Sequence, residues 1–295
     1  MPRVKANNIE IEYETFGDPS SRPLLLIMGL GAQMIRWEVE FIEKFVEHGF
    51  YVIRFDNRDV GLSTKFDEAG EPDLMKLYMQ VAKGEKIEAS YTLNDMADDA
   101  AGLLSALNID KAHICGASMG GMIAQTVAYR HPSRVLSLTS IMSSTGNPDL
   151  PRPKPEAMKV LIQAPPTERE ALIEHGVNTM RLIHGTGFPF DEERAQKMVI
   201  ASLDRSNYRP GYSRQLAAIL ATGNRKQNLA SITAPTLVIH GSEDPLMPPD
   251  GGKDTVEAIP GAELLIIEGM GHSIPIEVWP QVMDAITENA NKAYQ

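Results

Sequence analysis

The chain has 295 residues, of which 43% are hydrophobic and 23% charged, as in a folded globular protein and unlike a disordered or collagen-like one. This length suits one large α/β domain that carries an inserted segment. With 28 basic and 39 acidic residues the formal net charge is −11. So negative a chain repels phosphate backbones and anionic lipid, so binding to nucleic acid or to a membrane surface is not expected.

The cysteine count and the hydropathy pattern exclude further classes of protein. The one cysteine, Cys115, excludes an intrachain disulfide framework and any Cys-x-x-Cys site, and we expect it to be a small buried side chain. No run of about 18 apolar residues is present, and no apolar segment follows the first charges, as a secretory signal would require. We therefore expect a cytoplasmic protein without a membrane span.

Short, nearly continuous apolar runs alternate with helical patterns, which predicts a mostly parallel sheet with helices on both faces. Residues 9–14 alternate between apolar and acidic side chains, which predicts an antiparallel edge strand with one face in water. The predicted buried strands are Pro23–Met28, Tyr51–Phe55, Ala112–Cys115, Val135–Met142, Thr236–His240 and Glu263–Ile267. The predicted helices are Trp37–His48, Thr92–Leu107, Met119–Tyr129 and Ile276–Asn289, the second opening with a capping box at Thr92 and Asp95.

One region breaks this alternation. From about Asn147 to Asn228 no strand is predicted, prolines mark its start, and it contains at least three helical patterns. One of these patterns begins with a second capping-box sequence, Thr167–Glu170. We therefore predict a core domain of residues 1–146 and 229–295, with residues 147–228 inserted after the sixth strand as a helical cap over the sheet.

The turn between one predicted strand and the next helix contains a candidate nucleophile. It reads Gly116-Ala117-Ser118-Met119-Gly120-Gly121, and a serine on such a tight, strained turn needs small neighbours. A Gly-x-Ser-x-Gly pattern is weak evidence by itself, but a buried strand before it and an amphipathic helix after it strengthen the prediction. Ser118 is the predicted nucleophile.

A serine hydroxyl needs a base, and the chain has seven histidines. Those at helix ends, in buried strands or in the insert are His48, His113, His131, His175, His184 and His240. His272 instead lies in the glycine-containing loop 269–273, directly after the last predicted strand. Because this loop ends at the carboxyl edge of the sheet, His272 is the predicted base.

The base needs a carboxylate to orient it, and the loop after the preceding strand offers two. Asp244 is preferred because its side chain is shorter and Pro245 restricts the backbone after it, and Glu243 is retained as the alternative.

The developing oxyanion needs two backbone N–H donors. The residue after the nucleophile, Met119, supplies one, and Leu30, directly after an early strand, supplies the other.

Together these motifs resemble those of the α/β-hydrolase superfamily over essentially the whole chain. The motifs that carry the resemblance are Gly116–Gly121, His240–Pro245, Gly271–His272 and Asp56–Ser63. Within the superfamily the chain is most similar to small bacterial carboxylesterases related to aclacinomycin methylesterase. It departs from the family pattern at Asp59, where a glycine is usual, and at Met28, where many relatives have a histidine. The resemblance implies a helical cap, and it implies that Asp56 and Arg58 hold the backbone rather than take part in catalysis.

The expected activity is hydrolysis of a small-molecule carboxylic ester through an acyl-enzyme, with no cofactor. No metal-ligand spacing and no Gly-x-Gly-x-x-Gly fingerprint are present, so we expect neither a metal nor a dinucleotide. The same residues also suit lactone opening, C–C bond hydrolysis and cofactor-free perhydrolysis, and a non-catalytic binding protein remains an alternative. Apolar side chains of the insert that suit a pocket wall are Met158, Met180, Met198, Phe188 and Phe190.

Overall fold

The computed structural model describes residues 2–295 and contains an eight-stranded sheet in the order β1-β2-β4-β3-β5-β6-β7-β8. β1 and β2 are antiparallel to their neighbours, and the strands from β4 to β8 run parallel. The strands are β1 Arg3–Ala6, β2 Ile9–Phe16, β3 Arg22–Ile27, β4 Phe50–Phe55, β5 Ala112–Ala117, β6 Val135–Ile141, β7 Thr236–Gly241 and β8 Glu263–Ile267. This confirms the predicted mostly parallel α/β sheet.

Helices follow most strands, and each of the four predicted helices is present within a few residues of its expected bounds. The helices are α1 Val39–Glu47, α2 Leu74–Ala82, α3 Leu93–Ala106, α4 Met119–Arg130, α5 Pro155–Ile162, α6 Arg169–Ile183, α7 Glu192–Arg205, α8 Pro210–Thr222, α9 Lys226–Leu229, α10 Asp250–Ala258 and α11 Trp279–Asn291. Helices α2, α9 and α10 were not predicted. Within residues 2–295 no helix is both long enough and apolar enough to cross a membrane.

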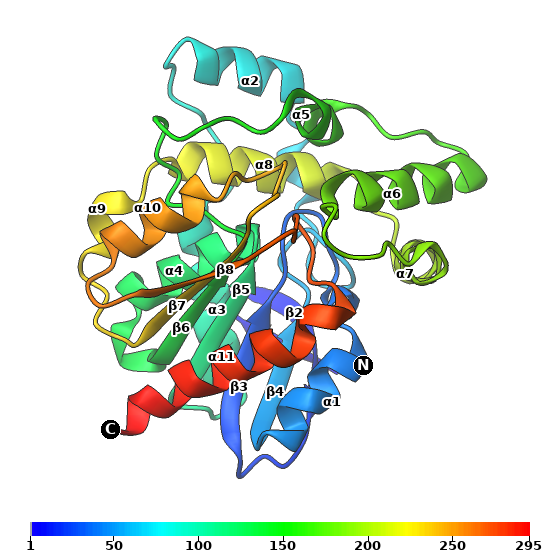
Figure 1. Ribbon diagram of the computed structural model, residues 1–295. Helices are drawn as coiled ribbons and strands as arrows, with labels where there is room; N and C mark the ends of the chain where they lie inside the picture. The colour runs from blue at the N-terminus through cyan, green and yellow to red at the C-terminus, as the bar shows by residue number, and fades with distance from the viewer. Residues whose placement is uncertain (1) are drawn as a thin grey trace.

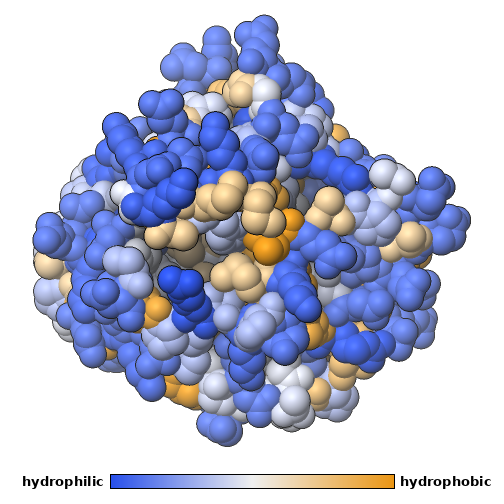
Figure 2. Space-filling view, turned by 90° about the horizontal axis from the view of Figure 1, so that it is seen from above, coloured by the Kyte–Doolittle hydropathy of each residue, from blue (hydrophilic) through white to orange (hydrophobic). Residues whose placement is uncertain are grey.

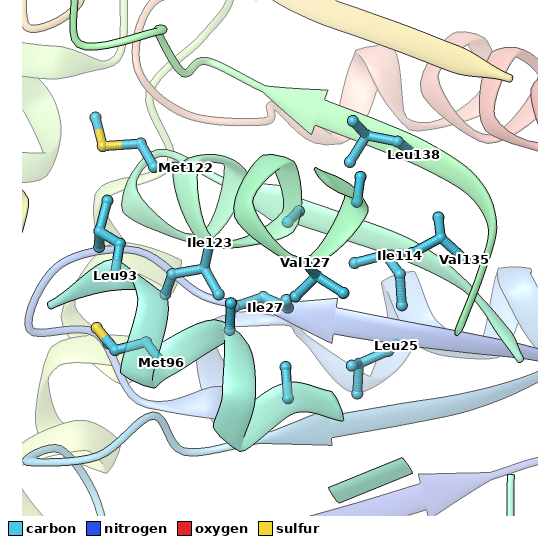
Figure 3. Packing of buried hydrophobic residues seen from close by; sticks show 14 of the residues in the cluster. Leu25, Ile27, Leu93, Met96, Ile114, Met122, Ile123, Val127, Val135 and Leu138 are labelled. Carbon is cyan, nitrogen blue, oxygen red and sulfur yellow. The ribbon is translucent and has the colours of Figure 1, made fainter. Parts of the chain in front are cut away.

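The alternation of side chains along each strand divides the core into two apolar layers. Along β3, Leu25 and Ile27 face the layer that contains α3 and α4, whereas Leu24 and Leu26 face the layer that contains α1 and α11. Figure 3 shows the first layer, with Ile123 of α4 packed between the sheet and α3. Strands buried on both faces must be apolar throughout, which is why they were recognisable in the sequence.

The antiparallel strand predicted at residues 9–14 is present as β2, but its predicted edge position is wrong. β1 pairs outside it, from Arg3 opposite Glu12 to Ala6 opposite Ile9. Glu12 is 2% exposed, and its carboxylate pairs with Arg3 at 2.9 Å. The face of β2 that was expected to be in water is therefore partly covered. β1 has four residues, two of them cationic, and a segment so short carries no readable hydrophobic period.

The two predicted capping boxes have different outcomes. The box at Thr92 and Asp95 is formed at the start of α3 and is confirmed. The box predicted at Thr167–Glu170 is wrong, because α6 starts at Arg169 with Glu168 as its N-cap and no side-chain cap bond. The helix itself is present, since its apolar residues rather than its cap determine where it packs.

The segment between β6 and β7 is helical, as predicted, and within it no strand is formed. Figure 1 shows α5, α6 and α8 lying beyond the carboxyl ends of the parallel strands, with α2 beside α5 above them. The loops that follow β3, β5, β7 and β8 end beneath these helices. Because the predicted site residues lie on those loops, the helical segment faces them across the sheet edge.

Candidate active site

Ser118 lies on the tight turn between β5 and α4, with a sparsely populated backbone conformation of φ 57° and ψ −122°. Its N–H donates to the carbonyl of Ile141 at 2.9 Å, which anchors the turn to β6. A Cβ at Gly116 would lie 2.0 Å from the carbonyl oxygen of Gly120, and a Cβ at Gly120 would lie 2.1 Å from that of Ile27. The predicted need for small residues around Ser118 is therefore confirmed.

The structure brings His272 and Asp244 into direct contact. His272 Nδ1 lies 2.6 Å from Asp244 Oδ2. The other carboxylate oxygen, Oδ1, accepts the N–H groups of Leu246 at 2.9 Å and Met247 at 2.8 Å, so the buried carboxylate has a fixed orientation. With Nδ1 bound to Asp244, Nε2 is the ring nitrogen left to face a substrate.

Glu243, the alternative acid, faces away from His272. Its Oε2 accepts hydrogen bonds from the N–H and the hydroxyl of Thr186, both at 2.7 Å. These bonds lower the pKa of the Glu243 carboxyl. Ser242 and Glu243 lie in a turn, so that one acid of the pair contacts the imidazole while the other connects the loop to the insert.

Ser118 and His272 line the same cavity. Among residues 2–295 no hydrogen bond joins the Ser118 hydroxyl to the His272 ring in this structure. Such bonds are often long or misaligned without a substrate and tighten when one binds. A side-chain rotation at Ser118, which is partly exposed, changes the position of its Oγ.

The two predicted oxyanion donors belong to segments that meet at Ser118. A Cβ added to Gly29 would lie 3.1 Å from the Cβ of Ser118, so the loop after β3 passes directly beside the serine. Leu30 on that loop and Met119 at the first position of α4 both line the cavity. The N–H at the start of a helix has no partner within the helix, so Met119 is free to donate to a ligand.

Two amide side chains that the sequence analysis did not single out hold this loop. Asn57 Nδ2 donates to the carbonyl of Met28 at 2.8 Å. Gln215, a fully buried residue of α8, accepts the N–H of Gly31 at 2.8 Å and donates to the carbonyl of Arg58 at 2.8 Å. These bonds support the loop in a chain that has methionine, rather than histidine, at position 28.

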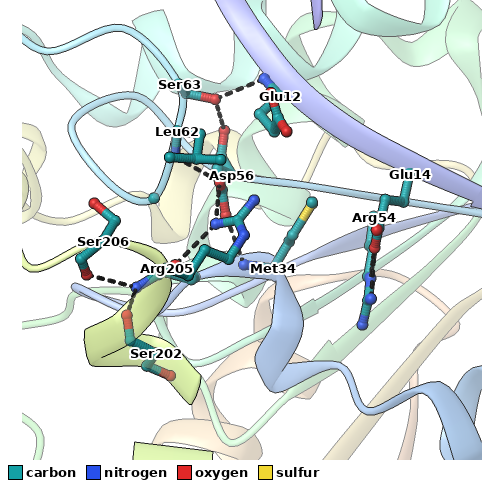
Figure 4. A network of polar contacts seen from close by, with 12 residues as sticks. Glu12, Glu14, Met34, Arg54, Asp56, Leu62, Ser63, Ser202, Arg205 and Ser206 are labelled. Atoms are coloured by element: carbon teal, nitrogen blue, oxygen red, sulfur yellow. Dashed lines mark hydrogen bonds and ion pairs between the residues drawn. The ribbon is translucent and has the colours of Figure 1, made fainter. Parts of the chain in front are cut away.

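Asp56 organises the backbone on the other side of the loop, as the sequence predicted. Its carboxylate accepts the N–H groups of Met34 and Leu62, both at 2.8 Å, and pairs with Arg205 of α7 at 2.7 Å (Figure 4). Arg58 pairs with Asp99 of α3 at 2.6 Å. Both residues therefore have structural partners, and Asp56 also connects the insert to the loop after β3.

The backbone conformation at position 59 explains why a glycine is usual there. The φ of Asp59 is 68°, which glycine adopts without strain. In this chain the carboxylate of Asp59 accepts hydrogen bonds from Nε and Nη2 of Arg214, both at 2.8 Å, and from the hydroxyl of Tyr91 at 2.7 Å. Burial alone would raise the pKa of Asp59, but these partners lower it below its ordinary value. The pair joins the core to α8 through two fully buried side chains.

We expect Asp59→Asn to destabilise the protein by about 3–5 kcal/mol at pH 7, since it leaves the buried Arg214 guanidinium without its counter-charge. Because the folded-state pKa is lowered, this stabilisation is present above about pH 4 and is lost as the pH falls through the folded pKa. Urea unfolding of wild type and variant at pH 7 and at about pH 3 measures both effects. The difference in the free energy of unfolding between wild type and variant should be smaller at the lower pH.

The matched control is Asp204→Asn, at a carboxylate that pairs with Arg169 at 2.6 Å on the exposed surface of α7. Exposed pairs contribute less than about 1 kcal/mol, so this variant should unfold close to wild type. Equal losses from the two substitutions would contradict a special role for the buried pair.

The loop that carries His272 is held by the insert. The N–H of His272 donates to the carbonyl of Ile183 at 2.6 Å, and that of Gly271 donates to the carbonyl of His184 at 2.9 Å. A Cβ on Gly271 would lie 2.3 Å from the carbonyl oxygen of Ile183, which explains the glycine before His272. The sequence signal for this contact is the Gly185-Thr186-Gly187 turn after α6, whose meaning depends on a long-range partner.

A cavity of about 1440 Å³ lies between the sheet edge and the helices of the insert. Figure 2 shows apolar side chains gathered around a hollow in the face seen from above. Of the insert side chains proposed for a pocket wall, those that line the cavity are Met158, Met180, Met198 and Phe190. Phe188 does not line it and instead packs against the core layer that contains α1 and α11.

Two further side chains with reactive groups, Cys115 and His113, are buried in the core. Cys115 is fully buried, and burial raises the pKa of its thiol, which disfavours the nucleophilic thiolate. His113 is bonded to Ser137 at 2.8 Å, and burial lowers its pKa to about 4. Across residues 2–295 no group of three or more His, Cys, Asp or Glu side chains is arranged to hold a metal ion.

Comparison with known proteins identifies relatives along nearly the whole chain. The chain is 31% identical to the rhodomycin D methylesterase DnrP of Streptomyces peucetius, over 99% of both proteins. It is 30% identical to the rhodomycin D methylesterase DauP of Streptomyces sp. strain C5, over 98% of both. The meta-cleavage product hydrolase CumD from Pseudomonas fluorescens IP01 has the same fold, with a TM-score of 0.76 at 22% identity over 99% of this chain and 98% of that one. The family model described as alpha/beta hydrolase fold matches residues 22–277, so the chain belongs to the α/β-hydrolase family.

Proposed function

We propose that the protein hydrolyses carboxylic esters through an acyl-enzyme intermediate, with Ser118 as nucleophile, His272 as general base and Asp244 as its orienting carboxylate. The observation that carries this proposal is the 2.6 Å contact between His272 Nδ1 and Asp244 Oδ2, with His272 and the strained Ser118 turn at one cavity. Similarity to two methylesterases over nearly the full chain supports an ester substrate.

The proposed reaction has two halves. In the first, Nε2 of His272 takes the Ser118 proton as Oγ attacks the ester carbonyl, and the N–H groups of Leu30 and Met119 bind the developing oxyanion. The C–O bond to the alcohol then breaks, and the imidazolium returns its proton to the leaving alcohol. In the second, His272 removes a proton from water, which attacks the acyl carbon, and the acid leaves as Ser118 regains its proton.

We further propose that residues 147–228 act as a cap on the core formed by residues 1–146 and 229–295. This proposal is supported by the hydrogen bonds that the N–H groups of His272 and Gly271 donate to the carbonyls of Ile183 and His184, and that the N–H of Gly31 donates to Gln215. In this arrangement the insert does two things: it forms the upper wall of the cavity and it positions the loops that carry the base and an oxyanion donor.

The size and lining of the cavity favour an ester with a bulky apolar acid part. A volume of about 1440 Å³ is larger than a simple acetate ester needs, and the methionine side chains in its wall adapt to irregular apolar shapes. The two relatives are named as methylesterases, so the proposed leaving group is a small alcohol such as methanol.

A substrate panel tests this proposal. We expect kcat/KM for a methyl ester of naphthylacetic acid to exceed that for methyl acetate by at least about 100-fold, because the ring system buries apolar area in the cavity. A fluorophosphonate should form an adduct on Ser118, identified by peptide mass spectrometry. Faster turnover of a lactone or a β-diketone than of any methyl ester would contradict ester hydrolysis, and ligand binding without an adduct would favour a binding protein.

A further inference from the structure

Arg36 places a positive charge in the wall of the cavity. It is the last residue of the short 3-10 helix η1, Met34–Arg36, which follows the loop that carries Leu30. Its Nη1 donates to the thioether sulfur of Met180 at 3.1 Å, and its side chain is partly exposed. A thioether is a weak acceptor, so this bond satisfies little of the hydrogen-bonding capacity of a guanidinium.

The other arginines that line the cavity in the described chain bind oxygen. Arg194 pairs with Glu38 at 2.7 Å, and Arg209 donates to the backbone carbonyl of Pro165 at 3.0 Å. Glu38 lies two residues after Arg36 and favours its charged form, but its Oε2 is occupied by Arg194. Among these lining arginines, Arg36 is therefore the one whose hydrogen bond is to sulfur rather than to oxygen.

In the described chain the guanidinium of Arg36 therefore has donors left to bind a ligand. Burial of Arg36 lowers its pKa from the ordinary value, although a guanidinium still keeps its proton at neutral pH. A cation that is partly removed from water is stabilised by a counter-charge or by several acceptors. A carboxylate satisfies it best, because its two oxygens match the planar fork of donors on arginine.

Arg36 and the His272 loop both contact α6. Its partner Met180 is on α6, three residues before Ile183, which is a rise of about 4.5 Å along the helix. The carbonyl of Ile183 accepts the N–H of His272. The guanidinium and the His272 loop therefore contact α6 within about one turn of each other, and Arg36 and His272 both line the one cavity.

We propose that Arg36 binds an anionic oxygen group on the acid part of the substrate, so that the preferred substrates are esters that also carry a free carboxylate. This inference rests on the proposed ester hydrolysis at Ser118. Arg36 acts on specificity, since it holds the group distant from the reacting bond while the apolar wall covers the chain between them.

Matched ester pairs test the inference. The anionic series consists of monomethyl esters of straight-chain dicarboxylic acids from four to ten carbons, and the neutral series consists of methyl alkanoates of the same lengths. We expect Arg36→Met to lower kcat/KM for the best anionic ester by about 10–100-fold, mostly through KM, with neutral esters changed less than about 3-fold. Arg36→Lys should retain part of the preference, because it keeps the charge but loses the planar fork.

The matched control is Arg169→Met on α6, the helix that carries Met180, because Arg169 pairs with Asp204 at 2.6 Å on the exposed surface and does not line the cavity. It should leave the ratio of anionic to neutral kcat/KM within about 2-fold of wild type. The inference would be overturned if Arg36→Met lowered kcat/KM equally for both ester series, or if the wild type preferred the neutral series.

A binding measurement separates this inference from the proposed reaction. Ser118→Ala should bind monomethyl adipate in calorimetry, and adding Arg36→Met should weaken that binding at least about 10-fold. If wild type hydrolyses no ester but this difference in binding is seen, ester hydrolysis fails and the anion site stands. If Ser118→Ala and the double variant bind monomethyl adipate equally, the anion site is excluded whatever the activity.

Discussion

Ser118→Ala should lower kcat for a methyl ester by at least about 10⁴-fold while the protein stays folded. Without Oγ no acyl-enzyme forms, and the remaining rate comes from the oxyanion donors and from binding alone. The melting temperature should change little, because alanine meets the same backbone strain at φ 57° and the hydroxyl is partly exposed. Steady-state kinetics with enzyme purified to remove host esterases, together with circular dichroism, measure both quantities.

Ser143→Ala is the matched control for this loss. Ser143 lies in the loop after β6 with its Oγ buried and without a hydrogen-bond partner in the described chain, and it does not line the cavity. We expect its activity to stay within about 3-fold of wild type, since no catalytic contact is removed. If Ser118→Ala kept more than about 1% of wild-type kcat with its fold intact, Ser118 would not be the nucleophile.

Asp244→Asn should lower kcat by about 10⁴-fold with a much smaller change in KM. The carboxylate now holds the proton of His272 on Nδ1, so Nε2 is free to accept the Ser118 proton. An amide NH₂ at this place would donate to Nδ1 and move the ring proton to Nε2, which abolishes the base. Asp244 does not line the cavity, so substrate binding is not directly affected.

Glu243→Gln is the control that separates the two neighbouring acids. Glu243 bonds to Thr186 and not to His272, so its loss should change kcat by less than about 5-fold. The experiment measures kcat and KM for both variants over pH 6–9. Comparable losses in kcat from the two substitutions would mean that charge in the loop, rather than orientation of His272, supports the activity.

Much of the fold was predictable because the parallel strands are buried on both faces. Ile239 and Leu26, for example, are fully buried in the middle of such strands, and their segments are apolar at nearly every position. β1 was missed because pairing with β2, and not its own hydropathy, makes Arg3–Ala6 a strand. Helices α9 and α10 are short or contain paired glycines, so their local propensity does not predict them.

The sequence by itself determined which predicted strand each candidate catalytic residue follows. A serine between glycines comes after one buried run, an acid after a later one, and a histidine after the last. These are local patterns, because a strained turn demands glycine wherever the chain folds. The sequence preferred Asp244 over Glu243 but left both open, and the tertiary structure shows that Asp244 meets the imidazole. The tertiary structure alone decided that Gln215, Arg214 and Ile183 of the insert hold the core loops. The physical reason is that such bonds join residues far apart in the chain, and each side chain has many possible partners until packing selects one.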